Sequence, residues 1–327
     1  MDLVINSYGV TVSRDNNGFV INNADGRQRV PVAGVSSILI GRGALITSDA
    51  VLLAVDNEIE ILFTDPAGNP TARVWSPKYG SISTIRKGQL LFTQSPDSVP
   101  WIKDIVDKKI ENQQALILLM ANPDDPRAGN LKNTAINRLE AYRHKIASLQ
   151  GDRVADIASP LRGWEGTASR IYFETINEFL PAHYRFDQRT QRPAMDVANA
   201  MLNYGYGIMY GKIEGALIKA GIDPYIGVLH RNEYNRPALA FDIIELYRMW
   251  VDYVVFSLLA QRVMGDEHYS TRDDGSCWLE ALGRRIMIQS VNDFLHEVVE
   301  HDNMSRSRLT LIGIYAQELA QLFKKYN

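Results

Sequence analysis

The spacing of the apolar residues changes abruptly along this chain of 327 residues. Up to residue 94, short runs rich in Val and Ile alternate with turn sequences such as Asn17-Gly18 and Asp25-Gly26, which favour tight hairpins. From residue 101 onwards, long segments carry apolar residues at helical spacing. Residues 95–100, with two prolines, are expected to link the two parts. The pattern predicts an α+β protein.

The two predicted domains differ in kind. Residues 1–94 are expected to form a small, mostly antiparallel, β-sandwich-like N-terminal domain, and residues 101–327 a larger all-α domain. Strands are predicted at residues 10–13, 19–22, 29–32, 35–40, 58–63 and 71–75, with a short helix at 49–55. Helices are predicted at residues 99–121, 130–150, 164–179, 194–220, 238–263, 278–300 and 307–325. The polar residues 265–276 are expected to form a mobile loop.

The composition excludes several classes of protein. The formal net charge is -3, so any nucleic-acid site must rest on local groups of Arg and Lys. The single cysteine, Cys277, excludes a disulfide framework and a cysteine metal cluster, and its surroundings do not resemble those of a catalytic thiol. The N-terminus does not resemble a signal peptide, and no run of about 18 apolar residues could span a membrane. A cytoplasmic protein is expected.

Glu165 is the first polar residue in an unexpected place. On a helix it shares a face with Ala168, Ser169, Tyr172 and Ile176, and this face is expected to pack against the protein interior. A carboxylate carried towards the interior is costly unless it is paired or binds a metal. The alternative is that Glu165 lies near a helix N-terminus, where the helix dipole favours anions.

A second group surrounds residues 238–263, a segment that is apolar on nearly every side. Asp242 and Glu245 are three residues apart, and acids at that spacing can share one hard cation. They could equally form the narrow polar stripe of a buried helix. His230 lies just upstream, where it is either a hydrogen-bonded core residue or a ligand. Together with Glu165, these residues could hold Mn²⁺ or Mg²⁺ for phosphodiester chemistry.

Five arginines are candidates for binding DNA phosphates: Arg170, Arg185, Arg189, Arg192 and Arg248. Three of them lie in residues 183–192, where basic and aromatic residues alternate in a way that suits phosphate contact and base stacking. The alternative interpretation is a solvated loop whose arginines pair with neighbouring acids.

Four ordered segments resemble the signatures of the CRISPR-associated spacer integrase family. They are Glu165-Gly166-Thr167-Ala168 with Tyr172-Phe173, Arg192-Pro193 through Asn203-Tyr204-Gly205-Tyr206, Gly221-Ile222-Asp223-Pro224 with Gly227-Val228-Leu229-His230, and Leu239-Ala240-Phe241-Asp242-Ile243-Ile244-Glu245 with Arg248. Their order and spacing make the resemblance far more specific than any one of them.

The resemblance implies a helical catalytic domain in which Glu165, His230 and Glu245 hold the metal, with Asp242 beside them in the catalytic set. It implies strand transfer, in which the 3′-hydroxyl of a captured double-stranded DNA fragment attacks a phosphodiester of the CRISPR repeat. It also implies a homodimer, with two dimers bridged by a small second CRISPR-associated subunit.

Two other functions remain open at this point. A hydrolytic nuclease would use the same metal site with water as the nucleophile, and the residues do not separate hydrolysis from strand transfer. A non-catalytic DNA-binding scaffold would keep its acids for structural reasons, but the presence of all four polar residues argues against it.

Overall fold

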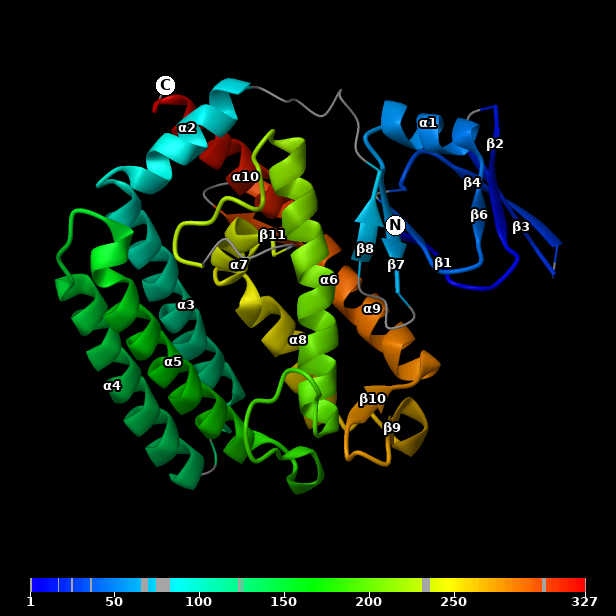
Figure 1. Ribbon diagram of the computed structural model, residues 1–327. Helices are drawn as coiled ribbons and strands as arrows, with labels where there is room; N and C mark the ends of the chain where they lie inside the picture. The colour runs from blue at the N-terminus through cyan, green and yellow to red at the C-terminus, as the bar shows by residue number, and fades with distance from the viewer. Residues whose placement is uncertain are drawn as a thin grey trace. The chain divides into compact units, whose positions relative to one another are not determined.

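A computed structural model describes residues 2–16, 18–24, 26–35, 37–65, 70–74, 83–122, 124, 126–230, 236–301 and 304–326. The chain divides into two compact units, Met1–Gly80 and Ser81–Asn327. Strands dominate the described part of the first unit and helices that of the second, which confirms the predicted α+β class (Figure 1).

The N-terminal unit contains two four-stranded sheets and one helix. Its elements are β1 (Asp2–Ile5), β2 (Thr11–Asp15), β3 (Gly18–Asn23), β4 (Gly26–Pro31), β5 (Ser37–Ile40), β6 (Leu45–Ile46), α1 (Ser48–Asp56), β7 (Glu60–Thr64) and β8 (Pro70–Arg73). One sheet has the order β4-β3-β2-β6 and the other β1-β5-β7-β8. Their inward residues form one apolar core that includes Val12, Phe19, Ile38 and Ile61.

The expected antiparallel arrangement holds only for part of this unit. Strands β2, β3 and β4 pair antiparallel, as the hairpin sequences predict. The prediction is wrong for β1, β5 and β7, which pair in parallel. Parallel neighbours need a crossover connection, and α1 lies in the connection between β5 and β7. Strands β1 and β6 were not predicted.

The second unit is mainly helical. Its helices are α2 (Ser83–Gln94), α3 (Ser98–Met120), α4 (Pro126–Ser148), α5 (Val154–Phe179), α6 (Val197–Lys219), α7 (Ala238–Ile244), α8 (Arg248–Ala260), α9 (Ala281–His296) and α10 (Arg308–Lys324). Helices α3, α4 and α5 pack side by side, and α6 packs against α7, α8, α9 and α10 (Figure 1). None of the described helices is long and apolar enough to cross a membrane.

Close packing sets α6 in this arrangement. It is apolar on nearly every side, with Met201, Leu202, Met209 and Ile213 fully buried. A Cβ atom at Gly205 would lie 2.5 Å from Cγ1 of Val251, so glycine is what allows α6 to approach α8.

The predicted linker at residues 95–100 does not separate the two units, which divide between Gly80 and Ser81. Helix α2 was not predicted, and it packs against α10 in the second unit. A side chain at Gly88 would overlap the carbonyl oxygen of Phe323. Gln89 also donates to the carbonyl oxygens of Asp223 (2.7 Å) and Ile226 (3.0 Å). Residues 95–97 therefore form a turn between two helices of one unit, and residues 98–100 belong to α3, which begins at Ser98.

Three further expectations about the helical part were wrong. The helix predicted at 238–263 is interrupted between α7 and α8. There the backbone nitrogens of Leu246 and Tyr247 donate to carbonyl oxygens three residues earlier, as in a turn, and the Leu246 carbonyl accepts from Asn112 (3.1 Å). Residues 265–276 are not an irregular loop throughout, because they include the strand β9 (Tyr269–Thr271), which pairs with β10 (Cys277–Leu279). A second hairpin, β11 (Val298–His301) with β12 (Met304–Ser307), precedes α10. The second unit is thus not purely helical.

Candidate active site

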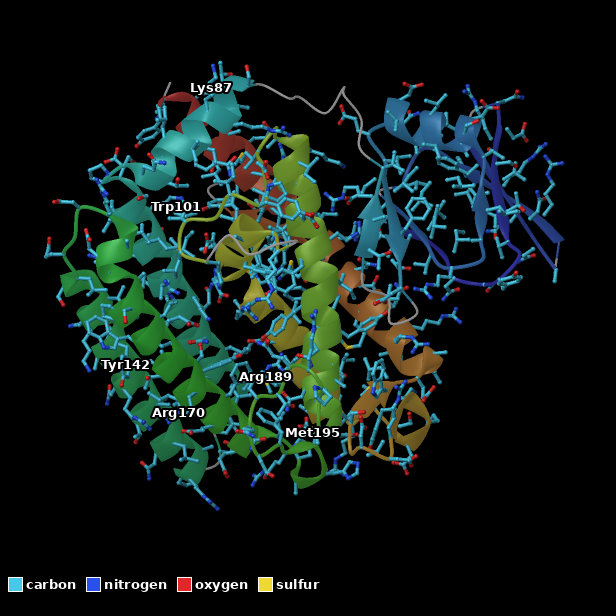
Figure 2. All side chains as sticks on the ribbon, viewed as in Figure 1. Lys87, Trp101, Tyr142, Arg170, Arg189 and Met195 are labelled. Atoms are coloured by element: carbon cyan, nitrogen blue, oxygen red, sulfur yellow. The ribbon has the colours of Figure 1, made fainter. Side chains whose placement is uncertain are left out.

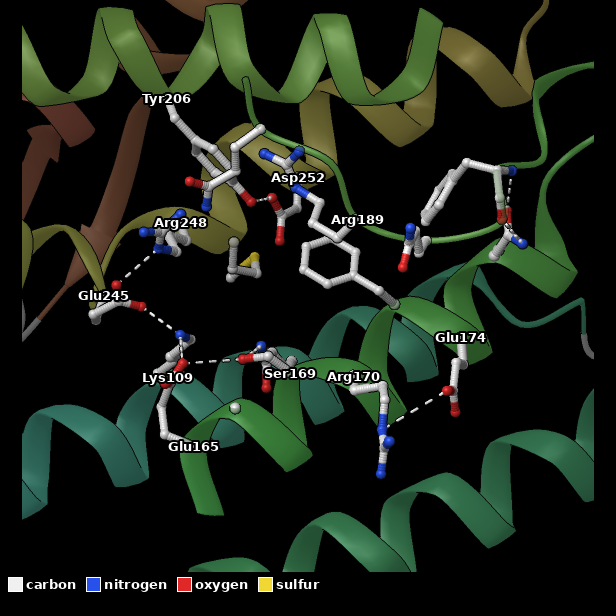
Figure 3. A pocket seen from close by; sticks show the side chains of 18 of the residues that line it. Lys109, Glu165, Ser169, Arg170, Glu174, Arg189, Tyr206, Glu245, Arg248 and Asp252 are labelled. Carbon is white, nitrogen blue, oxygen red and sulfur yellow. Dashed lines mark hydrogen bonds and ion pairs between the residues drawn. The ribbon is translucent and has the colours of Figure 1, made fainter. Parts of the chain in front are cut away.

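A cavity of about 770 Å³ lies among α3, α5, α6 and the α7–α8 segment. Three of the four predicted catalytic side chains line it: Glu165, His230 and Glu245. Lys109 from α3 lines it as well, and Figure 3 shows this lysine between the two carboxylates. Segments far apart in the sequence therefore contribute to one polar site.

Glu165 lies in the middle of α5, not at the N-terminus of a helix, because α5 begins at Val154. The residues on its face, Ala168, Tyr172 and Ile176, are fully buried, as predicted. Its carboxylate contacts the ammonium of Lys109 and accepts a hydrogen bond from Ser169 (3.1 Å). The alternative that rested on the helix dipole is wrong.

Glu245 ends α7 and turns into the same cavity. Its Oε2 lies 2.6 Å from Nζ of Lys109, and its Oε1 accepts from Nε of Arg248 at 2.9 Å. Burial alone would raise the pKa of this carboxyl, but the charges of Arg248 and Lys109 outweigh burial and lower it to about 2. Glu245 is therefore a carboxylate at neutral pH.

Asp242 does not join Glu245. Its buried carboxylate accepts from the backbone nitrogens of Val228 (2.6 Å), Leu229 (3.2 Å) and His230 (3.0 Å). Oδ1 also lies 2.7 Å from Nδ1 of His230. The expectation that Asp242 and Glu245 share one cation is therefore wrong, because the carboxylate of Asp242 bonds the loop of residues 228–230. It orients the imidazole and the loop that carries it.

The donor set fits a hard divalent cation. Two carboxylates and one imidazole face the cavity, and Asp242 holds Nδ1 of the imidazole, which leaves Nε2 as its available donor atom. In the part of the chain that the structure describes, no three His, Cys, Asp or Glu side chains are grouped closely enough to hold a metal as they stand. The ammonium of Lys109 sits between the two carboxylates instead.

Asp252 forms a separate buried cluster at the cavity wall. Its carboxylate accepts from the hydroxyl of Tyr172 at 2.8 Å and from the hydroxyl of Tyr206. Burial raises the pKa of Asp252, against the hydrogen bonds from the two tyrosines. These hydroxyls tie α5 and α6 to α8.

A family model described as CRISPR associated protein Cas1 matches residues 3–293. The chain belongs to this family. A curated relative, CRISPR-associated endonuclease Cas1 1 of Archaeoglobus fulgidus, is 28% identical over 336 residues, covering 99% of this chain and 96% of the relative.

Two solved structures share the fold. One is a casposase bound to integration product, with a TM-score of 0.81 and 19% identity over 100% of this chain and 91% of that chain. The other is a Cas6-RT-Cas1–Cas2 complex, with a TM-score of 0.80 and 21% identity over 99% of this chain and 35% of that chain. The fold of these structures therefore extends over both units of the chain.

The candidate arginines of this Cas1-family chain lie in different surroundings. Arg170 on α5 is exposed, its nearest acid is Glu174 at 3.9 Å, and it lines the cavity (Figures 2 and 3). Arg192 lies on an exposed turn. These two arginines present accessible guanidinium groups.

The other three arginines are engaged by protein groups. Arg189 donates to Asn199 (2.8 Å) and Asn203 (2.6 Å). Arg185 contacts Glu178, and Arg248 donates to Glu245 and lies over the ring of Tyr206 at 4.6 Å. A role for these three in binding DNA stays a prediction.

Two other sequence interpretations changed. Tyr184 and Phe186, within the basic and aromatic segment, are buried, so this segment is not a solvated loop throughout. The thiol of Cys277 is buried, and burial followed by the charge of Asp196 raises its pKa to about 11. Cys277 is therefore not an activated nucleophile, as expected.

Lys109 is the functional residue that the sequence reasoning missed. It falls on the face of α3 that otherwise buries Ile102, Ile105, Val106 and Leu116. A lysine at such a position is rare unless it is paired. That break in the apolar pattern is the signal that could have identified it.

Proposed function

We propose that this chain is a metal-dependent DNA endonuclease and integrase of CRISPR adaptation. It would join the 3′-hydroxyl ends of captured double-stranded DNA fragments to the CRISPR repeat by transesterification. The observation that carries the proposal is that Glu165, His230 and Glu245 all line one cavity. The carboxylate of Asp242 bonds Nδ1 of the imidazole.

In this reaction the 3′-hydroxyl oxygen attacks a phosphorus atom of the repeat. A new phosphodiester forms, the bond to the 3′-oxygen of the repeat strand breaks, and that oxygen takes up a proton as the attacking hydroxyl loses one. One phosphodiester replaces another, so the step needs no oxidant, reductant or covalent enzyme intermediate. The protein mainly positions two DNA ends, which can contribute several powers of ten to the rate.

Glu165, His230 and Glu245 would hold the cation, Mn²⁺ or Mg²⁺. When bound, such an ion polarises the phosphate and lowers the pKa of the attacking hydroxyl. Asp242 keeps the proton of His230 on Nδ1, so that Nε2 carries the lone pair a ligand needs. Arg170 lies at the cavity where it can meet a phosphate.

The family and the related structures support the proposed partners. Double-stranded DNA is the substrate, and the casposase that shares this fold is bound to an integration product. We further propose a homodimer, two copies of which are bridged by a small second CRISPR-associated subunit. The Cas6-RT-Cas1–Cas2 complex supports such a partner. One of its chains contains a region with this fold, and its name gives Cas2 as a second component. The proposed site of action is the cytoplasm.

A strand-transfer assay tests the proposal. A labelled duplex fragment, a plasmid carrying a CRISPR repeat and Mn²⁺ are mixed with the protein, and covalent labelling of the plasmid is followed. A fragment with 3′-deoxy ends is the matched control, because it lacks only the attacking hydroxyl. Labelling that requires the 3′-hydroxyl supports transesterification. Plasmid cleavage without joining, at the same level with both fragments, would indicate hydrolysis.

A further inference from the structure

The side chain between the two acids of the site is itself a cation. Lys109 has only 8% of its side chain exposed, and its ammonium contacts Oε1 of Glu165 and Oε2 of Glu245. These carboxylates come from α5 and from the end of α7, and the lysine comes from α3. One ammonium therefore bridges two acids that come from different helices (Figure 3).

The ammonium occupies the place between the two carboxylates that a shared divalent cation would need, and Arg248 bonds the other oxygen of Glu245. The ammonium of Lys109 is attracted by both carboxylates. A divalent ion bound to the same oxygens would repel this ammonium. The bond to Glu245 is also geometrically imperfect. Oε2 of Glu245 is buried and, despite its closeness to Lys109, has no well-aligned hydrogen bond among the described residues.

A place for the displaced ammonium exists one helical turn away. Gln113 is four residues after Lys109, so both side chains lie on the same face of α3. Both also line the cavity. Within the described residues, Oε1 of Gln113 is buried and accepts no hydrogen bond. A buried acceptor without a donor costs free energy, and a lysine nitrogen would satisfy it.

We propose that Lys109 is a built-in counter-cation that the divalent metal must displace, and that Oε1 of Gln113 receives its ammonium. The lysine holds the two carboxylates close to each other and lowers the affinity of the site for the divalent metal. Without it, the carboxylates of Glu165 and Glu245 would repel each other. The inference rests on the proposed function, because it concerns the regulation of the same site.

Metal affinity measured without DNA tests the inference. Mn²⁺ is titrated into the wild type and into Lys109→Met, with binding followed by the electron paramagnetic resonance signal of free Mn²⁺. Lys109→Met is expected to bind Mn²⁺ about 10- to 100-fold more tightly, since a competing charge is removed. Lys108→Met is the matched control, because Lys108 is the exposed neighbour and its loss changes the net charge equally. It should bind as the wild type does.

Two further variants complete the experiment. Lys109→Gln removes the charge but keeps a donor, so it replaces Lys109→Met if that variant does not fold, and it should also bind more tightly. Gln113→Leu removes the acceptor and should weaken Mn²⁺ binding about 10- to 100-fold, the effect of losing one hydrogen bond to a charged group. Unchanged or weaker binding in the Lys109 variants overturns the inference alone. Absence of Mn²⁺ binding in every protein would also overturn the proposed metal site.

Discussion

Oδ1 of Asp242 lies 2.7 Å from Nδ1 of His230 and 3.0 Å from the backbone nitrogen of the same residue. Its other oxygen accepts from the backbone nitrogens of Val228 and Leu229. One carboxylate thus fixes both the imidazole and the loop that carries it. Asp242 acts through His230, which makes it a positioning residue within the predicted catalytic set.

Asp242→Asn should reduce strand transfer by about 10- to 100-fold, the usual effect of losing a residue that orients a metal ligand. The amide has one acceptor oxygen, so its nitrogen would face donors in the loop. The same change at the exposed Asp273 serves as the control. Joining rates and Mn²⁺ affinity are measured together, and wild-type values for both would contradict a positioning role.

His230→Ala should abolish joining and leave the fold intact. The side chain is 41% exposed, so its loss removes a ligand with little loss of packing. The free energy of unfolding should fall by about 1–3 kcal/mol, because the buried carboxylate of Asp242 loses the imidazole as a hydrogen-bond partner. Activity assays and denaturant melts check this, and normal joining with an unchanged melt would exclude His230 as a ligand.

The predicted catalytic set and the buried cluster of Asp252 should respond differently to mutation. Tyr172→Phe removes one of the two hydroxyls that Asp252 accepts from, and it should lower the free energy of unfolding by about 1–3 kcal/mol. Joining by the folded protein should remain within a few-fold of wild type, and Mn²⁺ affinity should not change. A large loss of Mn²⁺ affinity with unchanged stability would instead place Asp252 in the metal site.

Replacing an accessible arginine should change the salt dependence of DNA affinity, whereas replacing an arginine that bonds protein groups should not. Arg170→Ala should flatten the dependence of log affinity on log salt by about one unit, because one phosphate contact is lost. Arg189→Ala should instead destabilise the fold by about 1–3 kcal/mol, since its guanidinium bonds Asn199 and Asn203. Equal effects on the slope would show that Arg189 also meets DNA, as the sequence alone suggested.

The sequence predicted those features that depend on local pattern. Glu165 was placed correctly on a packed helix face, because the face is visible in the spacing of Ala168, Tyr172 and Ile176. Four polar residues were grouped because they lie in segments that resemble known signatures. The fold class followed from the change in periodicity along the chain.

The features that were missed depend on tertiary contacts. Helix α2 has a mixed sequence, and its place is set by the close approach of Gly88 to α10. The break between α7 and α8 is stabilised by Asn112 of another helix, so the apolar run 238–263 gave no sign of it. The lysine at position 109 interrupts an apolar helix face in the sequence, but its two carboxylate partners are brought to it by the packing of α3, α5 and α7. Tertiary contacts also separate the two acids three residues apart: Asp242 bonds His230, whereas Glu245 pairs with Lys109 and Arg248.

The central claim is that Glu165, His230 and Glu245 hold one divalent cation. The shift in melting temperature on adding Mn²⁺ tests it most directly, in the wild type and in Glu165→Gln/Glu245→Gln. At about 100 times the dissociation constant, Mn²⁺ should stabilise the wild type by about 2.7 kcal/mol and raise its melting temperature. The double variant should show no such rise, whereas Asp273→Asn/Glu318→Gln, with the same change in charge, should behave as the wild type does. A rise of equal size in the Glu165 and Glu245 double variant would contradict the account.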